Sequence, residues 1–103
     1  MAYELFLTEA AHEDLDGALR YISQELSNPQ AAANLLKQIE ACYGQLRDFP
    51  HLYEYCQDLR LRNQGYRKVI IDNFVLIYYP VESEQRIYLL RFFYGGRDYE
   101  KLI

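Results

Sequence analysis

The 103-residue sequence predicts one α+β domain, with a helical hairpin near the N-terminus packed on one face of an antiparallel sheet of four to five strands. Two observations support this class. Apolar residues recur at helical spacing through the first half of the chain, whereas β-branched and aromatic residues fill short runs between turns in the second half. The expected order of elements is therefore β-α-α-β-β-β.

The chain is expected to open with a short strand over residues 3–7. Thr8 then stands where an N-cap belongs, and Glu9 lies in the first turn, against the positive end of the helix dipole. Apolar residues spaced three or four apart follow, which predicts a helix over about residues 9–26.

A second helix is predicted to start at Asn28-Pro29, where the asparagine suits the N-cap and the proline suits the first helical position. Its apolar stripe continues to about Asp48, and Phe49-Pro50 ends it. The short connection between the two helices predicts an antiparallel helical hairpin.

Strands are expected through the second half of the chain. Residues 59–62 alternate leucine and arginine, which predicts a strand with one solvated face. Residues 65–79 predict a β-hairpin that turns at Asp72-Asn73, because these residues tolerate the positive φ of two-residue turns. A turn over 82–85 then leads into a last long strand over 86–94.

The strands over 69–79 and 87–93 are apolar on both faces. The helical hairpin is expected to cover one face, and no element of the chain is predicted to cover the other. An exposed apolar face of this kind indicates a partner protein.

The charge balance argues against a general nucleic-acid-binding domain. Eleven cations against fifteen acids give a net charge of −4. Four cations nevertheless lie between Leu59 and Val69 without an acid among them, which predicts one small patch that favours anions. The patch consists of Arg60, Arg62, Arg67 and Lys68.

No segment is long enough to span a bilayer and no signal peptide is evident, so we expect no membrane association and a cytoplasmic location. The two cysteines, Cys42 and Cys56, lack metal-binding spacing. We expect both to be reduced thiols, with Cys42 buried.

Motifs for a phosphate loop, a nucleophilic triad, paired catalytic carboxylates or a metal site are absent from the sequence, so neither a cofactor nor a metal is expected. His12 and His51 are interpreted as ordinary surface histidines.

The remaining candidates for chemistry are arginines and tyrosines. Arg67, Tyr94, Arg97 and Tyr99 would surround one concave site if the last strand lies beside the hairpin. Guanidinium groups bind phosphate, aromatic rings stack on bases, and a tyrosine of lowered pKa could act as general acid or base.

A purely structural interpretation fits these arginines and tyrosines as well. Arg60 and Arg62 would then be the solvated face of a strand, Arg91 would pair with an acid, and Tyr99 would anchor the C-terminal tail.

Four motifs together resemble the RelE/ParE superfamily of toxins from bacterial type II toxin–antitoxin modules. The motifs are Asn28-Pro29-Gln30-Ala31-Ala32, Leu46-Arg47-Asp48-Phe49-Pro50, Gly65-Tyr66-Arg67-Lys68 and the segment from Leu90 to Tyr99. The resemblance implies a compact α+β toxin that is neutralised by an antitoxin wrapped around it.

RelE-like members of this superfamily are ribosome-dependent endoribonucleases. By resemblance, Arg67 and Arg97 would stabilise the scissile phosphate, and Tyr99 is a loose match to a catalytic tyrosine. The RNA-binding residues would be Arg60, Arg62, Lys68 and Tyr94. Such nucleases are usually basic, and this acidic chain departs from that pattern.

ParE-like members instead inhibit DNA gyrase and are not enzymes. The Asn-Pro-x-Ala-Ala bend and the long paired helices favour this branch, whereas Arg67 and Arg97 favour the nuclease. A third alternative is a member that has lost toxicity and only binds its antitoxin.

Overall fold

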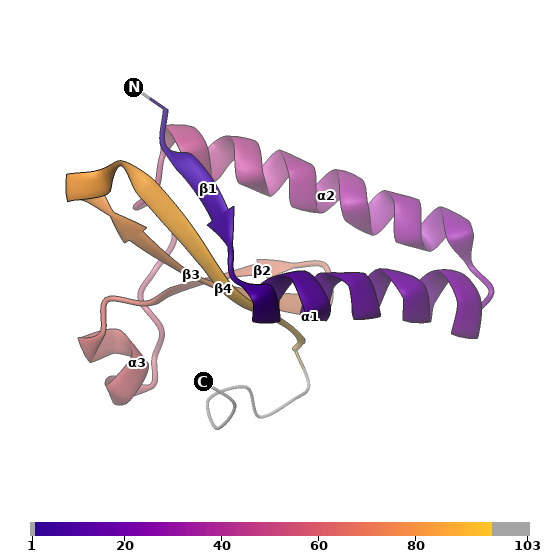
Figure 1. Ribbon diagram of the computed structural model, residues 1–103. Helices are drawn as coiled ribbons and strands as arrows, with labels where there is room; N and C mark the ends of the chain where they lie inside the picture. Colours follow the sequence, from indigo (N-terminus) through magenta and orange to yellow (C-terminus); the bar gives the residue numbers. More distant parts are fainter. Residues whose placement is uncertain (1, 96–103) are drawn as a thin grey trace.

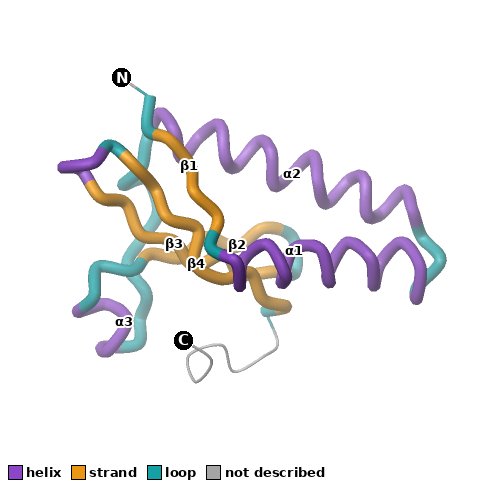
Figure 2. Tube along the Cα trace, viewed as in Figure 1, coloured by secondary structure: helices purple, strands orange, loops and turns teal. Residues whose placement is uncertain are grey.

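The computed structural model describes residues 2–95. A four-stranded sheet carries two long helices, which run side by side and extend past it (Figures 1 and 2). The elements are β1 (Glu4–Leu7), α1 (Glu9–Arg20), the π-helical turn η1 (Tyr21–Glu25), α2 (Pro29–Asp48), α3 (Leu59–Asn63), β2 (Arg67–Ile71), β3 (Phe74–Val81), the 3-10 turn η2 (Glu82–Glu84) and β4 (Arg86–Tyr94).

The sheet has the strand order β1-β4-β3-β2. The last three strands pair antiparallel, as predicted, and Asp72 adopts a φ of 55° in the two-residue turn between β2 and β3. β1, however, pairs parallel with β4, so the sheet is mixed and not wholly antiparallel. The parallel pairing is possible because the whole helical hairpin and two strands separate β1 from β4.

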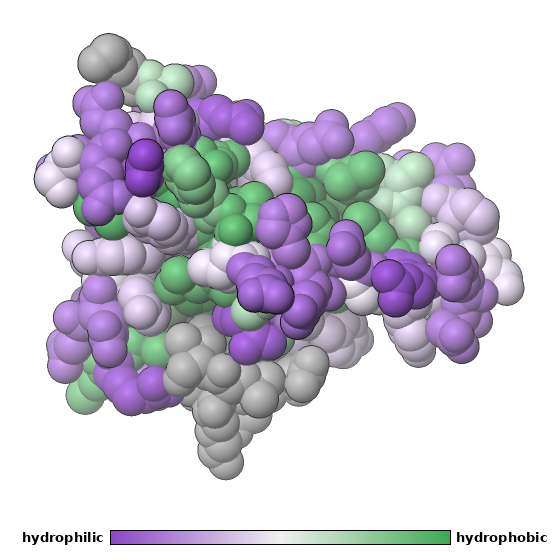
Figure 3. All heavy atoms as spheres, viewed as in Figure 1, coloured by the Kyte–Doolittle hydropathy of each residue, from purple (hydrophilic) through white to green (hydrophobic). Residues whose placement is uncertain are grey.

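The predicted caps hold both long helices at their first turns. The side chain of Thr8 accepts a hydrogen bond from the backbone N–H of Ala11 at 3.0 Å, and that of Asn28 accepts one from Ala31 at 3.1 Å. Apolar side chains gather between the two helices, while hydrophilic side chains line their outer sides (Figure 3). No helix among residues 2–95 is both long and apolar enough to cross a membrane.

The main core lies between the helices and the sheet. Leu35, Ile39 and Leu46 of α2 meet buried residues of all the longer strands, among them Tyr78 and Leu89. Cys42 lies in this core, and both cysteines are free thiols, as predicted.

The other face of the sheet is partly covered, which corrects the expectation that it would be bare. Val75 and Ile77 are buried there against Cys56 and Leu61, which come from the segment before β2. The chain between α2 and β2 folds back under the sheet, so only part of this face is available to a partner.

Residues 59–62 form a helix, so the predicted strand is wrong. The side chain of Asp58 accepts a hydrogen bond from the N–H of Leu61, and Gly65 follows the helix with a φ of 86°. This combination of N-cap and C-terminal glycine favours one helical turn. Leu61 is fully buried while Leu59 is exposed, which the alternating sequence did not predict.

Burial of Cys42 predicts that the fold loses stability in alkali. Burial raises the pKa of its thiol from 9.0 to about 11. The unfolded chain therefore releases this proton from pH 9 upward while the folded chain keeps it, and unfolding becomes easier as pH rises from 9 to 11. A shift of this size corresponds to about 2–3 kcal/mol at pH 11.

We expect Cys42→Ala to flatten the decline of stability between pH 9 and 10 in urea titrations. Above this window, Tyr43 and Tyr78 begin to contribute, because burial raises the pKa of each to about 12. An identical decline in wild type and variant would contradict the assignment to Cys42.

Candidate functional site

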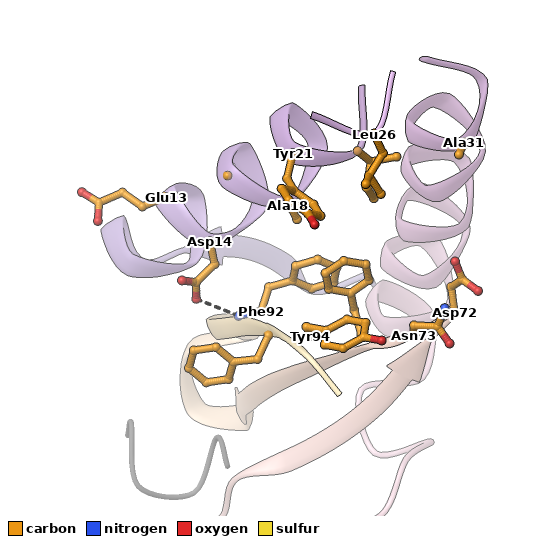
Figure 4. Close-up of a pocket in the computed structure, with 14 residues that line it drawn as sticks. Glu13, Asp14, Ala18, Tyr21, Leu26, Ala31, Asp72, Asn73, Phe92 and Tyr94 are labelled. Atoms are coloured by element: carbon orange, nitrogen blue, oxygen red, sulfur yellow. Dashed lines mark hydrogen bonds between the residues drawn. The ribbon is translucent and has the colours of Figure 1, made fainter. Parts of the chain in front are cut away.

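A groove of about 870 Å³ lies where α1 and η1 pass over the end of β4 and the turn between β2 and β3 (Figure 4). Its lining comes from parts of the chain that are far apart in sequence. The lining residues are Glu13, Asp14, Gly17, Ala18, Tyr21, Ile22, Leu26, Ala31, Asp72, Asn73, Phe74, Phe92, Phe93 and Tyr94.

The walls of the groove are mainly apolar and partly accessible. Phe74 and Phe92 stack with their ring centroids 4.8 Å apart, and Tyr94 packs edge-on against Phe74 at 5.8 Å. Tyr21, Leu26 and Tyr94 are each 56% exposed. Large side chains that are this exposed around a concave surface are typical of a protein-binding site.

The π-helical turn at the end of α1 supplies Tyr21 and Ile22 to this groove, and Leu26 follows directly after it. Leu26 donates its backbone N–H to the carbonyl of Tyr21 at 3.0 Å, a five-residue hydrogen bond that widens the helix. Ser27 then adopts a φ of 49° before α2 begins. Such turns often occur at functional sites.

Among the described residues, the lining of the groove is acidic, because it includes Glu13, Asp14 and Asp72 and neither a lysine nor an arginine. Asp14 is already engaged. It accepts hydrogen bonds from Arg91 at 2.7 and 3.0 Å and from the backbone N–H of Phe92 at 3.0 Å. Glu13 and Asp72 are exposed near opposite ends of the groove (Figure 4).

The Asp14–Arg91 pair confirms that Arg91 is the partner of an acid. The hydrogen bonds that Arg91 donates to Asp14 raise the pKa of Arg91 further, so its guanidinium stays charged.

A second, more polar cavity of about 540 Å³ lies beside the outer edge of β2, where residues 51–57 adjoin this strand. Arg62 from α3 and Arg67 from the start of β2 both line it. The other lining residues are His51, Leu52, Tyr53, Glu54, Tyr55 and Gln57.

The predicted site residues separate into two places. Arg67 lies opposite Tyr78 in the sheet and Tyr94 lies opposite Phe74, so the two are about 13 Å apart along β3. Among the described residues, Tyr94 lines the groove and Arg67 lines the second cavity. Arg97 and Tyr99 lie outside the described residues.

The remaining predicted RNA-binding residues lie on α3 and β2. Arg60 and Arg62 are exposed on α3, and Lys68 follows Arg67 on β2, so its side chain points to the opposite face of the sheet. Among the predicted residues that the structure describes, Arg62 and Arg67 line the same cavity.

Two tyrosines close to Arg67, Tyr53 and Tyr78, have a raised pKa, not a lowered one. Burial raises the pKa of Tyr53, which lines this cavity. Burial also raises the pKa of the neighbouring Tyr78, to about 12. Both hydroxyls stay protonated at neutral pH, the opposite of what a general base requires.

No group of three or more potential metal-binding side chains occurs in the described part of the chain. His12 and His51 are both exposed, and His51 lies 3.6 Å from the carboxylate of Glu82.

Apart from Tyr94, which was a predicted site residue, the groove residues were not assigned to a site by the sequence interpretation. Ile22 and Leu26 were expected in the buried helical stripe, and Tyr21 was not singled out. The one local signal was Leu26, a large apolar residue directly before Ser27-Asn28-Pro29.

Solved structures place this fold among the toxins of toxin–antitoxin modules. The chain is similar to a chain of the chromosomal ParDE system from P. aeruginosa, with 19% identity and a TM-score of 0.70 over 90% of this chain and 96% of that one. It is also similar to a chain of the RelBE2 complex from Mycobacterium tuberculosis, with 17% identity and a TM-score of 0.64 over 91% and 99% of the two chains. A chain of the E. coli RelBE complex matches at 12% identity and a TM-score of 0.61, over 93% and 100%.

The family follows from the sequence profile. Residues 5–99 match the profile of the ParE toxins of type II toxin–antitoxin systems, and the chain belongs to this family. No curated protein sequence matches it significantly. The resemblance to the RelE/ParE superfamily, stated from the sequence motifs, is confirmed.

Proposed function

We propose that this type II toxin arrests growth by inhibiting DNA gyrase until its antitoxin binds. The observation that carries the proposal is the match of residues 5–99 to the ParE profile. Three features support it: the net charge of −4, the separation of Arg67 from Tyr94, and the raised pKa of Tyr53. None of these suits a nuclease that docks on ribosomal RNA.

A ribosome-dependent endoribonuclease is the second candidate. It is favoured by Arg62 and Arg67, which line one cavity. In that reading Arg67 and Arg97 stabilise the scissile phosphate, Tyr99 transfers protons, and Arg60, Lys68 and Tyr94 contact RNA.

Purified gyrase and ribosomes distinguish the two candidates. Gyrase acting on relaxed plasmid with ATP should stall at excess toxin and accumulate cleaved DNA. Ribosomes that hold a defined message should leave that message intact. Normal supercoiling together with A-site cleavage would reverse the assignment, and no effect in either assay would favour a member that only binds its antitoxin.

The acidic, apolar groove is the surface that we propose for antitoxin binding. Similar chains occur in structures of toxin–antitoxin complexes, which supports an antitoxin partner for this chain. Tyr21, Leu26 and Tyr94 provide apolar contacts, and Glu13 and Asp72 favour basic residues in the bound segment.

We expect Leu26→Ala to weaken antitoxin binding by about tenfold or more, because truncating a central apolar contact typically costs over 1 kcal/mol. The partner to use is the cognate antitoxin, with affinity measured by calorimetry. Leu59→Ala is the matched control, since Leu59 is 70% exposed and lies outside the groove. Equal losses in both variants would argue against the groove.

A further inference from the structure

β2 is an edge strand, and the chain itself covers half of its outer edge. The backbone N–H of Cys56 donates to the carbonyl of Tyr66 at 2.9 Å, and that of Lys68 donates to Glu54 at 3.2 Å. Tyr55 pairs with Arg67 in an isolated antiparallel bridge. Residues 53–56, here called the edge segment, therefore act as a short fifth strand beside the start of β2.

The side chain of Arg67 contacts the edge segment twice. One terminal nitrogen, Nη1, donates to the carbonyl of Tyr53 at 2.6 Å, and the guanidinium carbon lies 4.0 Å from the centroid of the Tyr55 ring. Its Nε is buried without a hydrogen-bond partner among residues 2–95. In the described structure this guanidinium thus contacts the backbone carbonyl of Tyr53 and the ring of Tyr55.

Beyond the edge segment, the outer edge of β2 is open. Backbone groups two residues apart on a strand point to the same side, and the N–H of Lys68 points away from β3. The N–H and carbonyl of Ile70 therefore also point away from β3, and neither group has a backbone hydrogen-bond partner among the described residues. The Ile70 side chain is 69% exposed. An apolar, unpaired edge of this kind is prone to pair with other chains.

We propose that Arg67 is a positioning residue that holds the edge segment on β2 and so limits the open edge of the sheet to its C-terminal half. The arginine that resembles a catalytic residue of the nuclease branch has a structural task in this chain. Loss of that task should free the edge segment, extend the open edge from Ile70 back to Lys68 and leave the core intact. This inference is independent of the target of the toxin.

Amide hydrogen exchange followed by NMR tests the proposal. In Arg67→Met, the amides of Cys56 and Lys68 should exchange about tenfold faster or more, as expected for local opening, while the amide of Ile39 in α2 stays unchanged. Arg62→Ala is the matched control, because Arg62 lines the same cavity but donates no hydrogen bond to the edge segment in the described structure. Unchanged exchange at Cys56 and Lys68, or a uniform rise that includes Ile39, would overturn the proposal.

Tyr55→Leu provides a second test that leaves Arg67 in place. It removes the ring beneath the guanidinium, so it should raise exchange at the same two amides, and both variants should show more self-association with rising concentration in light scattering. If Arg67 instead acted only in phosphate chemistry, Tyr55→Leu would leave exchange and association unaffected.

Discussion

Leu35→Ala is expected to lower the free energy of unfolding by about 3 kcal/mol, the range found for truncated buried leucines. Leu35 is 1% exposed and lies in the core between α2 and the sheet. The substitution removes three buried carbons and leaves a space that the rigid sheet cannot close. Urea unfolding followed by circular dichroism measures the loss.

Leu36→Ala supplies the matched control, because the next residue of the same helix is 38% exposed. The change in helix propensity is the same in both variants, so the difference between them isolates burial. We expect Leu36→Ala to cost about 1 kcal/mol or less. Similar losses in the two variants would mean that α2 presents a different face to the sheet.

The helices and the antiparallel strands were predictable because their determinants are local. The caps at Thr8 and Asn28 need only the next three residues, and the turn at Asp72 needs only a residue that tolerates a positive φ. Periodicity of the apolar residues then selected which face of each helix is buried.

The helix α3 was missed because alternation over four residues does not distinguish a strand from a single helical turn. A strand would place Leu59 and Leu61 on one face, whereas the helical turn buries Leu61 alone. The cap signals at the flanking Asp58 and Gly65 favour the helix over the strand.

The functional surfaces were less predictable because they depend on contacts between distant residues. The parallel pairing of β1 with β4 and the five-residue hydrogen bond of Leu26 bring Tyr21 near Tyr94. Arg67 contacts a backbone carbonyl, that of Tyr53, which no side-chain pattern reveals. The sequence therefore indicated which residues could bind a phosphate but not which of them the fold engages.

Asp14→Ala is expected to destabilise the fold by about 2–3 kcal/mol, because it breaks a largely buried ion pair and removes three hydrogen bonds. The side chains of Asp14 and Arg91 are 15% and 27% exposed, so solvent screens the pair only in part. Asp14→Asn keeps an acceptor for the Phe92 N–H but loses the charge, and should lie between wild type and Asp14→Ala. Thermal unfolding of the three proteins at one pH gives the comparison.

The position of Asp14 also explains why this loss should reach the groove. β1 pairs with β4 only as far as Leu89, and Thr8 bonds the carbonyls of Leu89 and Leu90. After Leu90, the next contact on this side of β4 comes from α1, because Asp14 accepts a hydrogen bond from the N–H of Phe92. The neighbour of β4 is therefore α1, and no longer β1, where the groove begins. Glu13→Ala, an exposed neighbour on the same helix, should change stability by about 0.5 kcal/mol or less. If Asp14→Ala and Glu13→Ala lowered stability by equally small amounts, apolar packing alone would hold α1 to the sheet. The groove would then not depend on the Asp14 carboxylate.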